Sequence, residues 1–189
     1  MKLDRHAVFA VLVVVLLSAF FSWYVLTDRN NSPIVHPFPA AMQQYSSEEG
    51  VTFQYPDAYR LSSTHHSVGG FSWDSLELVD KSISVPANSD GPESISMSVF
   101  DDAEGLSLEQ FIKNEPRTNY QFSKEGTLTK GTIGGEPSLS YQYSGLYEND
   151  AVAVLHNKKI FLFSVSWSQT VEPIRKDFSK ILSTVSFQN

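Results

Sequence analysis

The sequence contains no cysteine. This absence excludes disulfide bonds, thiolate nucleophiles, cysteine-based metal sites and the lipid attachment of a lipoprotein. No glycine-rich loop of the kind that cradles phosphates is present, so nothing in the sequence indicates a nucleotide site. Basic residues are also fewer than acidic ones, 14 against 21, and the net charge is −7. Because a negative surface repels phosphate backbones, we expect no nucleic-acid partner.

Long hydrophobic runs are scarce, with one exception near the N-terminus. Residues Ala7–Leu26 carry no charge and are mostly aliphatic. A helix of about 20 residues, rising about 1.5 Å per residue, spans the roughly 30 Å hydrocarbon core of a bilayer. Trp23 and Tyr24 lie near the end of this run, where aromatic rings favour the membrane interface. The run therefore predicts a single transmembrane anchor over residues 7–26.

The charges around this anchor predict its orientation. Lys2 and Arg5 precede it, whereas Arg29 and then Arg60 are the next basic residues after it. Because basic residues favour the cytoplasmic side, we expect residues 1–6 to form a cytoplasmic tail and the remaining chain to be extracytoplasmic, at the cell membrane. The alternative is a cleaved signal peptide. The run is longer than a typical signal core, and its end lacks a small-residue cleavage site.

The chain beyond the anchor divides into a spacer and one domain. Residues 27–44 contain three prolines and no hydrophobic periodicity, which predicts an extended spacer. Residues 45–189 are long enough for a single folded domain with its own core.

Apolar and polar residues alternate in several segments of this domain, as in strands with one buried face. The segments are Val51–Tyr55, Ser75–Asp80, Ile83–Val85, Ile95–Val99, Gly126–Ile133, Leu139–Tyr143, Asp150–His156 and Lys159–Trp167. The last two flank Asn157-Lys158 and predict a hairpin. Residues 62–73 and 145–150 are expected to be loops.

Two helices are expected beside these strands. Ser107 and Gln110 have the spacing of a capping box, and Pro116 ends the helix that they begin. A second helix over residues 171–184 has one apolar stripe, which includes Phe178, and an opposite charged face. Because such a stripe must be buried against a sheet, the predicted fold is α+β, an antiparallel β-sheet flanked by helices.

The order of these segments resembles the PsbP-like family. The matching motifs are Tyr45–Pro56, the helix motif Ser107–Phe111, the turn Ile133–Pro137 and the closing segment Phe178–Phe187. The resemblance implies a PsbP-like α+β sandwich, here in a bacterial, membrane-anchored relative. Family members include an extrinsic subunit of photosystem II, and a small-GTPase-binding import factor shares the fold. Both act by binding other proteins, so the resemblance implies a binding role.

Residues with catalytic chemistry are present but do not form a motif. Ser72 lacks the second glycine of a nucleophile elbow. His65 and His66 are adjacent, so on a strand they would face opposite sides, and a surface loop explains them better. Asp101–Glu104 offers carboxylates to a cation but lacks the rest of a calcium-binding loop. We therefore expect no catalytic residue, no cofactor and no metal site.

The sequence favours a membrane-tethered, extracytoplasmic module that binds or assembles protein and is not an enzyme. Its candidate contact residues are Phe71, Trp73 and Tyr147, aromatic side chains expected in the two loops. The alternative for these side chains is that they pack back onto the core. The alternative function is an extracytoplasmic hydrolase, or a protein that binds a small ligand or cation. Its site would combine scattered residues such as Ser72, His65 and Asp101.

The predicted topology can be tested in cells. Protease added to intact spheroplasts should digest the domain, because the charge asymmetry places it outside the membrane. In untreated cells an antibody against the domain should detect the full mass of 21.1 kDa. A band shortened by the mass of the tail and anchor would contradict the uncleaved anchor.

Overall fold

The computed structural model describes residues 41–84, 91–101, 105–168 and 173–188. The predicted tail and anchor, and most of the predicted spacer, lie outside these residues. Within them, no helix has the length and apolar character needed to cross a membrane.

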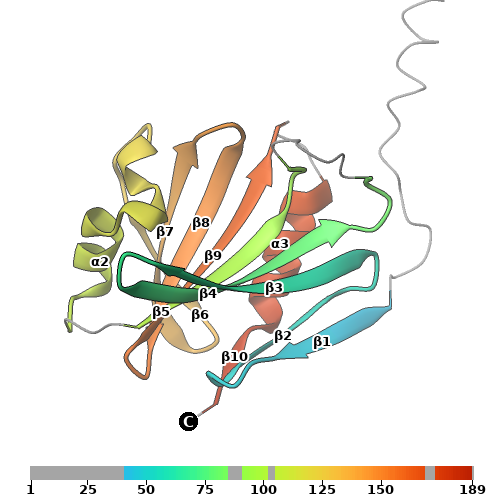
Figure 1. Ribbon diagram of the computed structural model, residues 1–189, viewed down its shortest axis with the longest axis horizontal. Coiled ribbons are helices and arrows are strands. Elements are labelled where there is room, and N and C mark those ends of the chain that lie inside the picture. The colour runs from blue at the N-terminus through green and yellow to red at the C-terminus, as the bar shows by residue number, and fades with distance from the viewer. Residues whose placement is uncertain (1–40, 85–90, 102–104, 169–172, 189) are drawn as a thin grey trace, which may run out of the picture. The chain divides into compact units, whose positions relative to one another are not determined.

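Ten strands in the described residues form two antiparallel sheets (Figure 1). The strands are Met42–Ser46 (β1), Val51–Pro56 (β2), Tyr59–Val68 (β3), Phe71–Asp80 (β4), Ile95–Asp101 (β5), Thr129–Ile133 (β6), Glu136–Ser144 (β7), Glu148–His156 (β8), Lys159–Trp167 (β9) and Ser186–Phe187 (β10). The larger sheet has the order β3-β4-β5-β9-β8-β7-β6, and the smaller has the order β1-β2-β10. The predicted antiparallel α+β architecture is confirmed.

Strand β9 lies at the centre of the larger sheet and is buried on both faces. Phe161, Phe163 and Val165 point into one core, which they share with β2 and the C-terminal helix α3, Pro173–Thr184. Ile160 and Leu162 point into a second core, beneath the short helix α2, Leu108–Asn114. A strand with alternating side chains can supply two cores only when both of its faces are apolar.

Local sequence explains where the helices begin and the hairpins turn. The Ser107 hydroxyl accepts a hydrogen bond from the Gln110 N–H, and the Gln110 side chain accepts one from the Ser107 N–H, so the predicted capping box is confirmed. Pro116 begins a short 3₁₀ turn, η2 (Pro116–Thr118), which is followed by η3 (Tyr120–Phe122). The predicted hairpin across Asn157-Lys158 is also confirmed, and both residues adopt positive φ.

Four predictions about the strands were wrong. Residues 148–150, expected in a loop, are the first residues of β8. Residues 62–73 are not a loop but belong to the hairpin β3–β4, which turns at Gly69-Gly70, where both φ angles are positive. Residues 62–67 of β3 are polar on both faces, so this part of the hairpin shows no alternation. Ile83, expected in a strand, lies in none. Strand β1 begins at Met42, inside the segment expected to be spacer.

Candidate functional site

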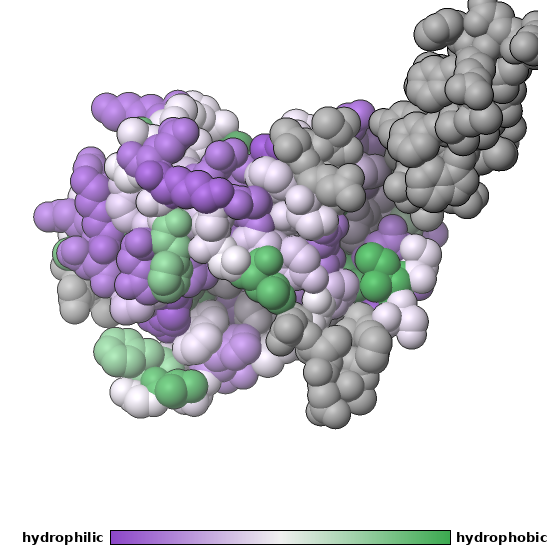
Figure 2. Space-filling model, turned by 90° about the horizontal axis from the view of Figure 1, so that it is seen from above, coloured by the Kyte–Doolittle hydropathy of each residue, from purple (hydrophilic) through white to green (hydrophobic). Residues whose placement is uncertain are grey.

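The β3–β4 hairpin ends in an exposed apolar tip. Val68 and Phe71 flank the turn, and they are 67% and 65% exposed. On the face shown in Figure 2, apolar side chains occur as small, separate patches among polar residues. The hairpin ends beside α2 (Figure 1), and this neighbour gives the tip a rigid base.

The base of the tip is an arginine surrounded by aromatic rings. The guanidinium carbon of Arg117, in η2, lies 4.6 Å from the ring centroid of Trp73 and 4.9 Å from that of Phe100. It lies 5.7 Å from the ring of Phe71. The face of an aromatic ring attracts a cation, so these contacts hold β4 and β5 against η2. We call Phe71, Trp73, Phe100 and Arg117 the arginine cage.

Glu115 fixes the arginine in this cage. Its carboxylate accepts two parallel hydrogen bonds from Arg117, from Nε at 2.6 Å and from Nη2 at 2.8 Å. These hydrogen bonds lower the pKa of Glu115, outweighing the opposite effect of its partial burial. The third guanidinium nitrogen, Nη1, is buried and has no hydrogen-bond partner among the residues that the structure describes. The cage is therefore charged, oriented and partly unsatisfied.

Trp73 is also held from its neighbouring strand. The His66 ring lies parallel to it, with centroids 4.6 Å apart, and His66 Nε2 is 2.7 Å from the Ser75 hydroxyl. The expectation that the two histidines lie in a surface loop was wrong, because both are on β3. A fixed indole beneath an exposed phenylalanine resembles the anchor residues of protein interfaces.

The third predicted contact residue lies elsewhere. Tyr147 is in the turn between β7 and β8, is partly buried, and donates a hydrogen bond to the Gly91 carbonyl at 3.0 Å. The strand ladder places this turn near the start of β5, whereas Trp73 lies near its end. The structure brings Phe71 and Trp73 together and leaves Tyr147 apart. Sequence reasoning missed Arg117, because no local pattern links it to strands about 40 residues earlier in the chain.

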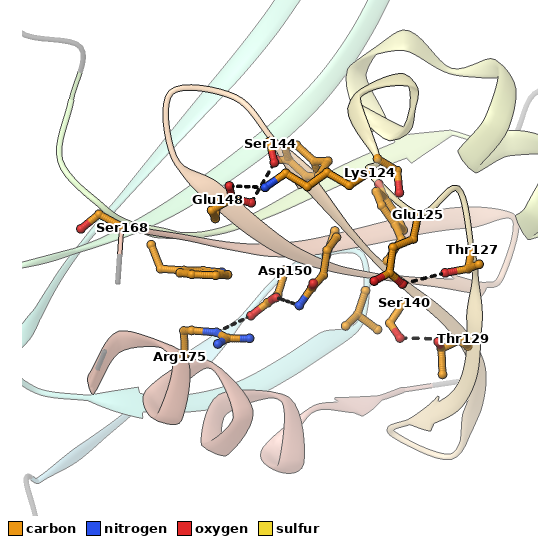
Figure 3. Close-up of a pocket in the computed structure, with 17 residues that line it drawn as sticks. Lys124, Glu125, Thr127, Thr129, Ser140, Ser144, Glu148, Asp150, Ser168 and Arg175 are labelled. Atoms are coloured by element: carbon orange, nitrogen blue, oxygen red, sulfur yellow. Dashed lines mark hydrogen bonds and ion pairs between the residues drawn. The ribbon is translucent and has the colours of Figure 1, made fainter. Parts of the chain in front are cut away.

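A polar groove of about 730 Å³ lies between α3 and the strands β7 and β8 (Figure 3). On one side, Arg175 Nε is 2.7 Å from Asp150 Oδ2, and the guanidinium stacks on Trp167, 4.3 Å from the ring centroid. On the other side, Lys124 Nζ is 2.6 Å from Glu148 Oε1.

These ion pairs limit the chemistry of the groove. Hydrogen bonds from Lys124 and Ser144 lower the pKa of Glu148, which makes it a weak proton acceptor at neutral pH. Asp150 accepts hydrogen bonds from both Gln142 and Arg175. Among the described residues, no histidine lines the groove. Two of the three carboxylates that line the groove, Glu148 and Asp150, are thus paired with Lys124 and Arg175.

A second groove, of about 410 Å³, lies between the β3–β4 hairpin and the turn that joins β1 to β2. We call it the acidic groove, since Glu48, Glu49 and Asp74 line it together with an apolar floor. His65 Nδ1 is 2.7 Å from Asp74 Oδ1. A catalytic histidine is oriented by a carboxylate in the same way. Among the described residues, no hydroxyl lies within hydrogen-bonding distance of the other ring nitrogen of His65.

The residues of the hydrolase alternative are not gathered. Ser72 pairs with Ser67 near the hairpin tip, and Asp101 at the end of β5 forms an ion pair with Lys159 at 3.0 Å. Neither Ser72 nor Asp101 lines either groove. The candidate cation segment extends to Glu104, outside the described residues. Within the described residues, no group of three potential metal ligands occurs.

Comparison with known proteins identifies the architecture. No protein-family model matches the sequence, and no curated protein matches it significantly. The solution structure of cyanobacterial PsbP (CyanoP) from Synechocystis sp. PCC 6803 is similar at 14% identity, with a TM-score of 0.52. The similarity covers 84% of this chain and 99% of that chain. The chain has a PsbP-like fold. The resemblance inferred from sequence motifs is thereby confirmed at the level of the fold.

On this PsbP-like fold, the ion pair in the arginine cage predicts a pH-dependent stability. Glu115→Gln should lower the free energy of unfolding by about 1–2 kcal/mol at pH 7, as expected for a hydrogen-bonded charge. Because the folded-state pKa of Glu115 is lowered, the stabilisation is complete above the unfolded-state pKa of about 4.3. It is lost as the pH falls through the folded-state value.

Urea unfolding of the full chain from pH 7 to pH 3 measures this effect. The difference between wild type and Glu115→Gln should shrink below about pH 4.3. In an Arg117→Met background the same substitution should cost much less, because the carboxylate no longer has its donor. An unchanged difference at pH 3 would contradict the assignment.

Proposed function

We propose that the chain is a membrane-tethered, extracytoplasmic module that acts by contact with another protein and not by catalysis. The tether is the uncharged run over residues 7–26, and the charge asymmetry around it supports an extracytoplasmic domain. The PsbP-like resemblance implies the same kind of role.

The observation that carries the proposal is the exposed tip above the arginine cage. Val68 and Phe71 project from a short turn, while Trp73 and Arg117 beneath them are fixed by stacking and by Glu115. Interface hot spots are enriched in aromatic and arginine residues that are held in place before binding. An interface of this design loses little conformational entropy when a partner covers it.

The hydrolase alternative has one observation in its favour, the close pair formed by His65 and Asp74. A hydrolase of this type also needs a nucleophile next to the base. Ser72 lies on the same strand as Asp74 but is placed opposite Ser67. The arrangement therefore favours contact over turnover.

Affinity capture from detergent-solubilised native membranes tests the proposal. Phe71→Ser in the full chain should weaken retention of the partner by roughly 30-fold, which corresponds to about 2 kcal/mol for a hot-spot residue. The matched control is Leu146→Ser, which changes an apolar side chain of similar exposure, 67%, in the β7–β8 turn. This control should retain the partner.

Two outcomes would contradict the proposal. One is equal capture by the wild type and Phe71→Ser of every retained protein. The other is hydrolysis of a simple ester such as p-nitrophenyl acetate by the full chain, with the activity abolished by His65→Ala and unaffected by Phe71→Ser.

A further inference from the structure

Strand β3 forms an unusually long free edge of the larger sheet. It contains ten residues, against about five or six in a typical strand, and it pairs only with β4 among the described strands. Every second residue of an edge strand turns its N–H and C=O groups away from the sheet. These groups are a template for another strand.

Beyond Arg60, near its start, the sequence of β3 does not protect this edge. Natural edge strands carry lysine or proline, or are short, and so avoid pairing with other chains. Residues 61–68 contain no lysine, no proline and no acidic residue. The opposite edge, β6, has only five residues and includes Lys130. The contrast between the two edges indicates that β3, unlike β6, can pair with a strand of another chain.

The acidic groove reaches the same edge. Ser63, Thr64 and His65 of β3 line it, with Leu76, Met97 and Val99 contributing apolar surface. Side chains alternate along a strand, so a strand added to β3 would direct every second side chain to this face of the sheet. A side chain of the added strand would then meet the groove.

The charges at the groove specify which side chain it accepts. Among the described residues, neither Glu48 nor Glu49 forms an ion pair, and Asp74 pairs only with His65. Burial and the negative charges of Glu49 and Asp74 raise the pKa of Tyr45 at the groove wall. The carboxylates of Glu49 and Asp74 therefore both lie close enough to Tyr45 to affect its hydroxyl group. Apolar walls with a negative rim suit the long stem and charged end of lysine or arginine.

We propose that the β3 edge and the acidic groove bind an extended segment of a partner protein, which adds to the sheet as a further strand and places a lysine or arginine side chain in the groove. The inference rests on the proposed binding function and specifies the chemistry of the partner. Main-chain hydrogen bonds to β3 supply affinity, and the groove supplies selectivity.

A second copy of this chain fits the edge less well. Antiparallel pairing of two β3 strands about a two-fold axis would place both acidic grooves on the same face beside the junction. Like charges would then approach each other, in a chain whose net charge is already −7. Charge complementarity favours a basic segment.

Selection from a random nine-residue peptide display library on the full chain in detergent tests the proposal. Selected peptides should be enriched in a single lysine or arginine flanked by strand-forming residues. The double variant Glu48→Gln and Glu49→Gln should lose this enrichment. The control variant, Glu77→Gln with Glu125→Gln, removes the same charge away from the groove and should keep it. All four carboxylates are at least partly exposed, and urea unfolding checks that both variants remain folded.

A resynthesised peptide separates strand addition from simple charge attraction. Methylation of alternate backbone nitrogens should weaken binding at least 10-fold, because the peptide can then no longer donate to β3. Absence of enrichment, enrichment that survives the Glu48 and Glu49 substitutions, or equal binding of the methylated peptide would overturn the proposal. So would a chain that sediments as a dimer which Ser63→Lys separates.

This experiment can fail independently of the proposed function. If membrane capture retains a partner through Phe71 while the library yields no basic peptide, only the β3 proposal is wrong. If capture also shows no dependence on Phe71, the binding function itself is contradicted.

Discussion

The burial of β9 on both faces is the constraint on which the rest of the fold depends. Phe161, Phe163 and Val165 require cover from β2 and α3, while Ile160 and Leu162 require cover from α2. The helices α2 and α3 therefore both pack on the core. The strands at the two ends of the larger sheet extend beyond them. Strands β3 and β4 form the flank in which the core ends and polar residues begin.

This division separates structural surfaces from surfaces that are available to a partner. The groove beside α3 is occupied by ion pairs between its own residues, such as Arg175 with Asp150. Within the described residues, the β3–β4 flank instead has an exposed apolar tip, an open strand edge and a groove in which Glu48 and Glu49 form no ion pair. Three features that favour contact thus lie on one hairpin and its immediate neighbours, and the arginine cage supports the first of them, the tip.

The sequence predicted those parts of the fold in which local signals agree with tertiary packing. The capping box at Ser107 and the hairpin at Asn157-Lys158 are determined by residues close in the chain. The β3–β4 hairpin was missed because residues 62–67 of β3 are polar on both faces, so no alternation marks them. Phe71 and Trp73 were chosen as contact residues because they were expected in a loop, but both are strand residues, and their contact role stays a prediction. The cage depends on contacts between β4 and η2, which no local pattern encodes.

Hydrogen–deuterium exchange of the full chain, alone and with its captured partner, tests the central claim most directly. If the β3–β4 flank is the contact surface, binding should slow amide exchange across residues 59–80, most strongly near the tip at 66–73. Protection confined to the polar groove, in residues 123–129 and the first turn of α3, would contradict the account.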